Sequence, residues 1–316
     1  MTGTRWELLR ALGAVAGDPA DARAACGALS LPGPGRAEHT EVFVLNCPPY
    51  AGLYLGSDGA LGGDAADRVA GFWRAIGVEP PAEPDHLTAL LSLYASLGEA
   101  RSGARTEAVR CALTRASQAL FWEHLWPWLP AYLAAVGEFP ALAAWAALTR
   151  RVVLAERAAY AERAEWAGHP SGPGGLGGRL PLALRAAPAP LSPGLAPGDL
   201  PAVLTTPVRS GLILTRRALA GGAEAAGAGH RIGERRFTLR AMLDQEPAGT
   251  LRWLGAETAR WADTHAALAR DRAAGPGRDA VQDWWAQRAR RTEAALRTAA
   301  AAAAAGPAAL GSPSAG

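Results

Sequence analysis

Residues 84–101 read PDHLTALLSLYASLGEAR, and their apolar pattern is the clearest example of the helical periodicity found along this chain. Apolar side chains recur there at the spacing i, i+3, i+4 and i+7, which places them on one face of an α-helix. Pro84 suits the first turn of a helix, where a missing N–H costs no hydrogen bond. The stretch therefore predicts an amphipathic helix over residues 84–101, whose core-facing stripe is Leu87, Leu90, Leu91, Tyr94 and Leu97.

The composition extends this interpretation to the whole chain of 316 residues. Hydrophobic residues make up 49% and charged residues 19%, which is enough apolar material for a sizeable core. Alanine and leucine are abundant, whereas isoleucine, which is β-branched and favours strands, occurs three times. We therefore predict an all-α protein: a single helical bundle domain with a long Gly/Pro-rich connection and additional C-terminal helices.

The periodicity also sets the expected organisation along the chain. Residues 38–46 could form a short strand, but a helix is favoured because no partner strand is visible. Between residues 167 and 201, 16 of 35 residues are Gly or Pro, which predicts a mobile connection. We expect a protease to cut first within residues 170–200. We divide the chain into a helical core (1–166), this connection (167–201), a C-terminal helical part (202–305) and a disordered tail (306–316). The other expected helices lie at 4–30 (one or two helices), 51–55 (a turn or a helix), 64–76, 105–122 and 123–136 (two helices or one bent helix), 140–166, 207–221, 236–245, 247–273 and 278–304.

The charged residues exclude several function classes. All 32 cationic side chains are Arg, so the chain has no lysine. This excludes nucleotide binding by a Walker A loop, a protein-kinase mechanism with its strand lysine, and catalysis through a lysine Schiff base. Residues 1–166 hold 14 Arg and 18 acidic residues, a net charge of −4, whereas residues 167–316 hold 18 Arg and 11 acidic residues, a net charge of +7. The acidic half suits a basic partner, and no basic-aromatic motif supports a nucleic acid as partner.

Sequence motifs for metals, catalysis and membranes are also missing. The three cysteines are far apart and form no CxxC pair, and neither GxSxG nor HExxH occurs. The glycine run at residues 174–178 precedes no convincing helix, which makes a phosphate loop a poor interpretation. No stretch approaches a membrane span, and the N-terminus is a poor signal peptide. We expect no cofactor, no metal and no stable membrane insertion, and a cytoplasmic location.

The run Glu83-Pro84-Asp85-His86 has two interpretations. It can be a helix start in which Asp85 stabilises the positive end of the helix. Alternatively, Glu83, Asp85 and His86 line a surface pocket, where carboxylates accept hydrogen bonds from guanidinium groups.

Aromatic residues gather in two further places. Three tryptophans occur within Trp122–Trp128, and Trp122 and Trp126 are spaced to face inward together. The alternative is an aromatic-walled groove for an apolar peptide. Pro48-Pro49-Tyr50 with Tyr54 is typical of a turn with a packed aromatic ring.

Together these residues resemble one family. Its pattern is matched by Glu41, Pro48-Pro49-Tyr50, Tyr54, Phe72-Trp73, Glu83 to Leu87, and Phe121, His124, Leu125 and Trp128, over about residues 38–166. The pattern resembles the TorD/DmsD/NarJ family of cytoplasmic chaperones that mature molybdenum redox enzymes. The resemblance implies an all-helical protein that is not an enzyme. It implies binding to the twin-arginine signal peptide of a molybdopterin-dependent precursor until the cofactor is inserted and the client is exported.

The resemblance also implies peptide-binding residues. Pro84, Asp85 and His86 are the first candidates, and the remaining candidates are Glu83, Trp73, Tyr50, Tyr54, His124 and Trp128. The chain departs from the family pattern by its length, because helices after residue 230 are not explained. These helices could complete the bundle, mediate dimerisation, or contact the client. The protein is accordingly expected to be a monomer or a homodimer.

Two other function classes stay open from the residues alone. One is a helical enzyme that acts on a small apolar substrate with His86 or His124 as the base, although no nucleophile is paired with either. The other is an adaptor subunit of a membrane-associated reductase.

Overall fold

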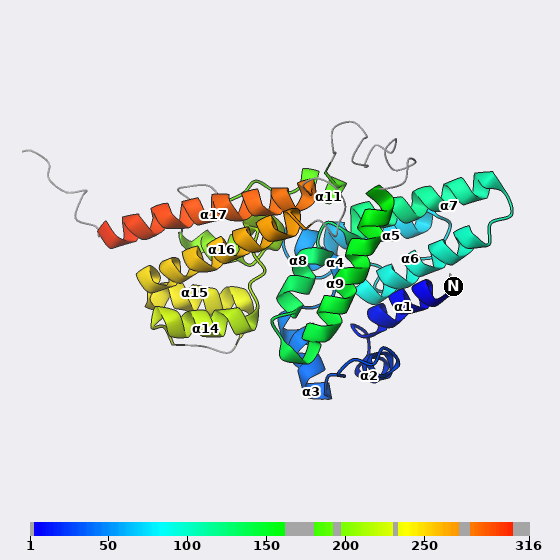
Figure 1. Ribbon diagram of the computed structural model, residues 1–316. Coiled ribbons are helices and arrows are strands. Elements are labelled where there is room, and N and C mark those ends of the chain that lie inside the picture. The colour runs from blue at the N-terminus through cyan, green and yellow to red at the C-terminus, as the bar shows by residue number, and fades with distance from the viewer. Residues whose placement is uncertain (1–2, 162–179, 192–196, 230–232, 272–278, 306–316) are drawn as a thin grey trace, which may run out of the picture.

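The computed structural model describes residues 3–161, 180–191, 197–229, 233–271 and 279–305. Within these ranges the regular elements are helical, which confirms the all-α prediction (Figure 1). The N-terminal elements are α1 (Gly3–Ala14), α2 (Pro19–Ala28), α3 (Arg36–His39), η1 (Thr40–Asn46), α4 (Ala51–Leu55), α5 (Gly63–Ala75), α6 (Leu87–Ser102), α7 (Glu107–Ala119), η2 (Leu120–Leu125), α8 (Leu129–Val136) and α9 (Pro140–Ala161). The later elements are α11 (Leu182–Arg185), η3 (Pro197–Asp199), α12 (Leu200–Leu204), α13 (Pro207–Ser210), α14 (Arg216–Ala226), α15 (Arg235–Gln245), α16 (Pro247–Ala269) and α17 (Ala280–Ala305).

Helix α6 begins three residues later than its sequence pattern predicts. His86 is the N-cap, and its Nδ1 accepts a hydrogen bond from the Thr88 N–H at 3.2 Å. Residues 85–87 are instead held against residues 49–51: the Ala51 N–H donates to the Asp85 carbonyl at 3.0 Å and the Leu87 N–H donates to the Pro49 carbonyl at 2.8 Å. The expected helix start at Pro84 is wrong because these long-range bonds hold His86 in an extended conformation, and α6 begins only after it.

Two π-helical turns, η1 and η2, interrupt the expected α-helical spacing. Residues 38–46 are helical, as favoured, but in part as the π-turn η1. Residues 105–136 were expected as two helices divided between 122 and 123 or as one bent helix, but η2 runs through that position and the division lies between η2 and α8, which starts at Leu129. Trp122 and Trp126 are both buried, which confirms that they face inward.

The later part of the chain is built around the long pair α16 and α17, which lie side by side, with α14 and α15 against α16 (Figure 1). The single helix expected over residues 207–221 is wrong, because Gly211 has a φ of +81° and separates α13 from α14. The expected connection at 167–201 is described only from 180 to 191 and from 197. Its described part contains α11 and the start of α12, while residues 162–179, 192–196 and the tail lie outside the described residues.

Both parts of the chain contribute to one hydrophobic core. At the junction, the buried Asp279 carboxylate accepts hydrogen bonds from the Trp126 indole at 2.8 Å and from the Val281 N–H at 2.9 Å. Asp279 therefore caps α17 and binds the earlier part of the chain at the same time. The Trp285 indole donates to the Pro127 carbonyl at 2.7 Å and adds a second bond across the junction.

The buried His265 gives the fold a pH dependence. Its Nε2 donates to the Gly211 carbonyl at 3.0 Å, and its ring stacks on Trp285 at 5.7 Å. Burial lowers the pKa of His265 to about 4, from an ordinary value of 6.5. In the unfolded chain His265 is therefore protonated below about pH 6.5, whereas in the folded chain it is protonated only below about pH 4.

We expect this histidine to lower the free energy of unfolding by about 2 kcal/mol between pH 7.5 and pH 5. Urea unfolding of the wild type and of His265→Gln at both pH values measures this contribution as the difference between the two pH dependences. An equal loss in both proteins would contradict the assignment to His265.

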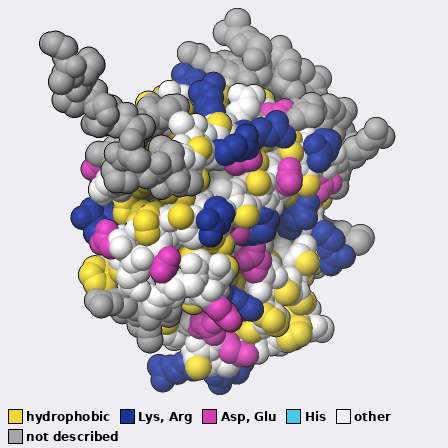
Figure 2. All heavy atoms as spheres, turned by 90° about the vertical axis from the view of Figure 1, so that its left-hand side faces the viewer, with side chains coloured by type: hydrophobic (Ala, Val, Ile, Leu, Met, Phe, Trp, Pro, Cys, Tyr) yellow, Lys and Arg dark blue, Asp and Glu magenta, His cyan; other side chains and the backbone are white. Residues whose placement is uncertain are grey.

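The surface mixes charges with apolar side chains. On the face that Figure 2 shows, Arg and acidic side chains lie among hydrophobic patches. Within the described part of the chain, no helix is both long and apolar enough to cross a membrane.

Candidate functional site

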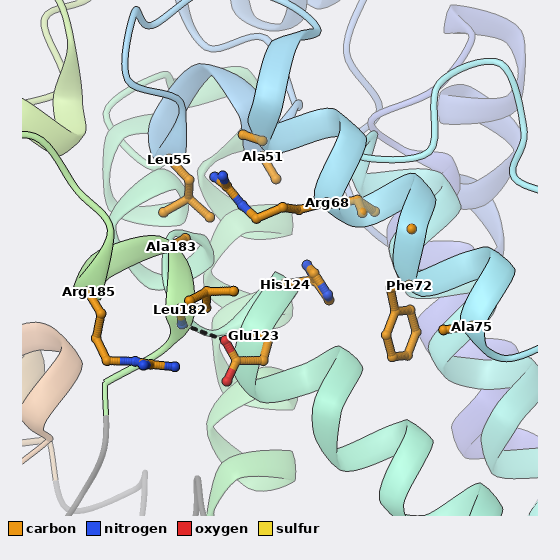
Figure 3. Close-up of a pocket in the computed structure, with 13 residues that line it drawn as sticks. Ala51, Leu55, Arg68, Phe72, Ala75, Glu123, His124, Leu182, Ala183 and Arg185 are labelled. Atoms are coloured by element: carbon orange, nitrogen blue, oxygen red, sulfur yellow. Dashed lines mark hydrogen bonds between the residues drawn. The ribbon is translucent and has the colours of Figure 1, made fainter.

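A cavity of about 370 Å³ lies between α4, α5, η2 and α11 (Figure 3). Its wall is mostly apolar, with few polar groups, as is usual for a ligand-binding cavity. The lining residues are Ala51, Leu55, Ala65, Arg68, Val69, Gly71, Phe72, Ala75, Glu123, His124, Leu182, Ala183 and Arg185.

Helix α5 supplies one wall of the cavity. Ala65, Val69 and Phe72 recur at intervals of three and four residues, so they share one helix face. Arg68 lies on the same side and forms an ion pair with Asp64 at 2.8 Å. This pair is partly exposed to solvent, so it contributes about 0.5 kcal/mol and can exchange partners.

The π-turn η2 brings the consecutive residues Glu123 and His124 to the cavity. The His124 ring lies 5.2 Å from that of Phe72, and Figure 3 shows both rings beside the cavity. Burial lowers the pKa of His124 to about 4, and the positive charge of Arg68 adds to the effect. The imidazole is therefore neutral near pH 7 and adds no charge to this wall.

Helix α11 forms the edge of the cavity beside Glu123 of η2. The Leu182 N–H donates to Glu123 Oε2 at 2.6 Å, the dashed line in Figure 3. The Leu184 side chain is buried in the core, whereas that of Leu182 is 48% exposed. Sequence reasoning missed Leu182 and Arg185 because Gly and Pro dominate around them. The signal was the apolar run Leu180 to Leu184.

Six of the residues expected to bind peptide lie together at the start of α4, next to the cavity wall. The Tyr50 hydroxyl donates to Glu83 Oε1 at 2.9 Å, and the Trp73 indole donates to the Pro84 carbonyl at 3.3 Å. The Tyr50 and His86 rings are 4.7 Å apart. Asp85, the sixth residue, binds the first turn of α4.

Asp85 does not line a surface pocket, and that expectation is wrong. Its side chain is only 3% exposed, and its Oδ2 accepts a hydrogen bond from the Gly52 N–H at 2.8 Å. A Cβ on Gly52 would lie 2.9 Å from the same oxygen, so the carboxylate has no room for a guanidinium there. Burial raises the pKa of Asp85, against the Gly52 hydrogen bond, which lowers it. Asp85 instead holds α4, whose Ala51 and Leu55 line the cavity.

The last three expected residues are divided between the core and the cavity. Tyr54 and Trp128 stack at 5.3 Å inside the core, where the Tyr54 hydroxyl donates to the Pro48 carbonyl. The Trp128 indole donates to the His124 carbonyl at 2.8 Å, so Trp128 fixes the backbone of a lining residue. Of the nine expected residues, His124 is the one that lines the cavity.

The described residues contain no group of three or more His, Cys, Asp or Glu side chains that could hold a metal ion. His86 and His124, the two bases considered for an enzyme, have separate surroundings: His86 caps α6 and packs on Tyr50 beside the start of α4, whereas His124 lies in the cavity wall.

Residues 34–134 match the family described as the nitrate reductase delta subunit. The match includes the lining residues of α4, α5 and η2, whereas α11 and the helices after it lie outside it. Comparison with curated proteins gave no match, and neither did comparison with solved structures. The match over residues 34–134 confirms the resemblance to the TorD/DmsD/NarJ family, a chaperone family for the maturation of molybdoenzymes.

Proposed function

We propose that this protein is a chaperone that binds the twin-arginine signal peptide of a molybdopterin-dependent redox enzyme and holds the precursor until its cofactor is inserted. The observation that carries the proposal is the apolar cavity, whose walls α4, α5 and η2 fall within the matched residues. At about 370 Å³ the cavity has room for a few apolar side chains of the peptide.

The charges around the cavity favour the apolar stretch of the peptide inside the cavity and its arginine pair outside it, near the start of α5. Arg68 and Arg185 in the lining repel an arginine pair, so only the apolar stretch of the peptide enters the cavity. Asp64 and Asp67 lie three residues apart at the start of α5 and are exposed, so they present two carboxylates side by side. Asp67 forms no ion pair among the described residues, and Asp64 can exchange Arg68 for a peptide arginine.

The residues at the start of α4 have a positioning role in this proposal. Pro84, Asp85 and His86 hold the first turn of α4 rather than contact the peptide. Glu83 is exposed and remains available to the peptide beside Tyr50.

A charge placed in the cavity should weaken peptide binding. Ala75 lines the cavity and is exposed, so Ala75→Glu adds a carboxylate there with little change in folding. We expect peptide affinity to fall at least tenfold, because an apolar side chain would have to desolvate that carboxylate. Isothermal titration with a synthetic peptide that contains an Arg pair and an apolar stretch measures this effect.

The matched control is Ala108→Glu, which makes the same substitution at an exposed position of α7 away from the cavity. A twin-lysine peptide should bind more weakly than the twin-arginine peptide, because only guanidinium pairs bidentately with a carboxylate. Asp64→Asn with Asp67→Asn should remove that preference. Equal peptide affinity in the wild type and Ala75→Glu would overturn the assignment of the cavity.

A further inference from the structure

Three arginines meet away from the cavity, where α13 packs on α17. A Cβ on Gly211, directly after α13, would lie 2.5 Å from the Ala289 nitrogen, so the two backbones are in contact. The Thr292 hydroxyl donates to the Ser210 carbonyl at 2.8 Å. These contacts place Arg209 beside the turn of α17 that carries Arg288 and Arg291, and the latter two share one face at the spacing i, i+3.

Arg288 is held rigidly in this cluster. Its side chain is mostly buried, its guanidinium carbon lies 4.5 Å from the centre of the Trp284 ring, and its Nη1 donates to the Pro188 carbonyl at 2.6 Å. Burial, together with the positive charges of Arg291 and Arg209, lowers the pKa of Arg288 to about 10. No carboxylate acts against them in this shift, and the described residues offer none of the three an ion pair.

Arg209 adds a second observation. Its Nε is buried and has no hydrogen-bond partner among the described residues. A buried donor without an acceptor costs about 1–3 kcal/mol, and uncompensated like charges add to that cost. An anion between these side chains would satisfy the donor and neutralise the cluster.

We propose that Arg209, Arg288 and Arg291 form a binding site for the phosphate group of a small soluble molecule. A phosphate carries close to two negative charges and several acceptor oxygens, so it suits three guanidinium groups better than a single carboxylate does. The site is compact and formed by two helices, whereas nucleic acid requires an extended basic stripe. The cluster shares no residue with the cavity, so it stands independently of the proposed peptide binding.

Titration of the full-length protein with inorganic pyrophosphate, at constant ionic strength, tests this site. We expect saturable binding by the wild type and at least a tenfold loss of affinity in Arg209→Gln and in Arg291→Gln. Arg291 is exposed, so its substitution should leave folding intact. Arg290→Gln is the matched control, because Arg290 is the exposed neighbour on the same helix and none of the contacts above involves it.

Three outcomes would overturn the site. One is no saturable binding of pyrophosphate, and another is unchanged affinity in both Arg209→Gln and Arg291→Gln. The third is an equal loss in Arg290→Gln, which would show attraction by the general positive charge of this part of the chain. Vesicles of phosphatidylglycerol form a separate arm: binding to vesicles without binding to pyrophosphate would contradict a soluble ligand.

Discussion

Replacing Asp279 by alanine should lower the free energy of unfolding by about 3–5 kcal/mol. The substitution removes the acceptor of the Trp126 indole and of two backbone N–H groups at the start of α17. It also removes the carboxylate 3.7 Å from the buried guanidinium of Arg157. Burial raises the pKa of Asp279 and lowers that of Arg157, so the interior accepts these two charges only together. Urea unfolding at pH 7 measures the loss.

Asp263→Ala is the control for this experiment, because Asp263 is exposed on α16 and should change stability by less than about 0.5 kcal/mol. Asp279→Asn should lie between the two, since its amide oxygen still caps α17 while the charge opposite Arg157 is gone. A loss below about 1 kcal/mol in Asp279→Ala would show that the junction does not depend on this carboxylate.

The second large effect is expected at Gly211. Its φ of +81° is left-handed, which costs a residue with a Cβ about 1–2 kcal/mol. The new Cβ would also lie 2.5 Å from the Ala289 nitrogen and 2.8 Å from its Cα, and backbone atoms inside a helix cannot move away as a flexible side chain can. Overpacking of this kind adds about 1–3 kcal/mol, so Gly211→Ala should destabilise the protein by about 2–5 kcal/mol.

Gly227→Ala separates the two causes. Gly227 has nearly the same backbone angle, a φ of +75°, but a Cβ there meets nothing within 4 Å. We expect only the conformational cost of about 1–2 kcal/mol in this control. Thermal unfolding of both variants compares them, and equal losses would mean that the contact with α17 contributes nothing.

Periodicity predicted the helices that bury one continuous stripe. Helix α15 was expected at 236–245 and is found at Arg235–Gln245, and α16 begins at Pro247, the first residue of its expected range. Periodicity failed where a distant partner decides the backbone. Nothing near Pro84 indicates that residues 49–51, more than 30 positions earlier, bind residues 85–87 and delay α6.

The candidate site was predictable in its neighbourhood but not in its geometry. The sequence singled out Asp85 as a carboxylate near a helix start, yet only the folded chain shows that the Gly52 N–H occupies it. His124 was found because it belongs to an aromatic run. Arg68 was missed as a site residue because its spacing from Asp64 indicates an ion pair on the helix surface. Leu182 was missed because it lies in a stretch rich in Gly and Pro.

The bonds between Trp126 and Asp279 and between Trp285 and Pro127 also have a genetic consequence. A nonsense mutation between residues 161 and 279 would delete Asp279 and Trp285 and expose apolar side chains of the earlier helices that the later part of the chain covers. Such a truncated product would not function as a shorter version of this protein. With its interior open to solvent, it would itself become a substrate for cellular proteolysis.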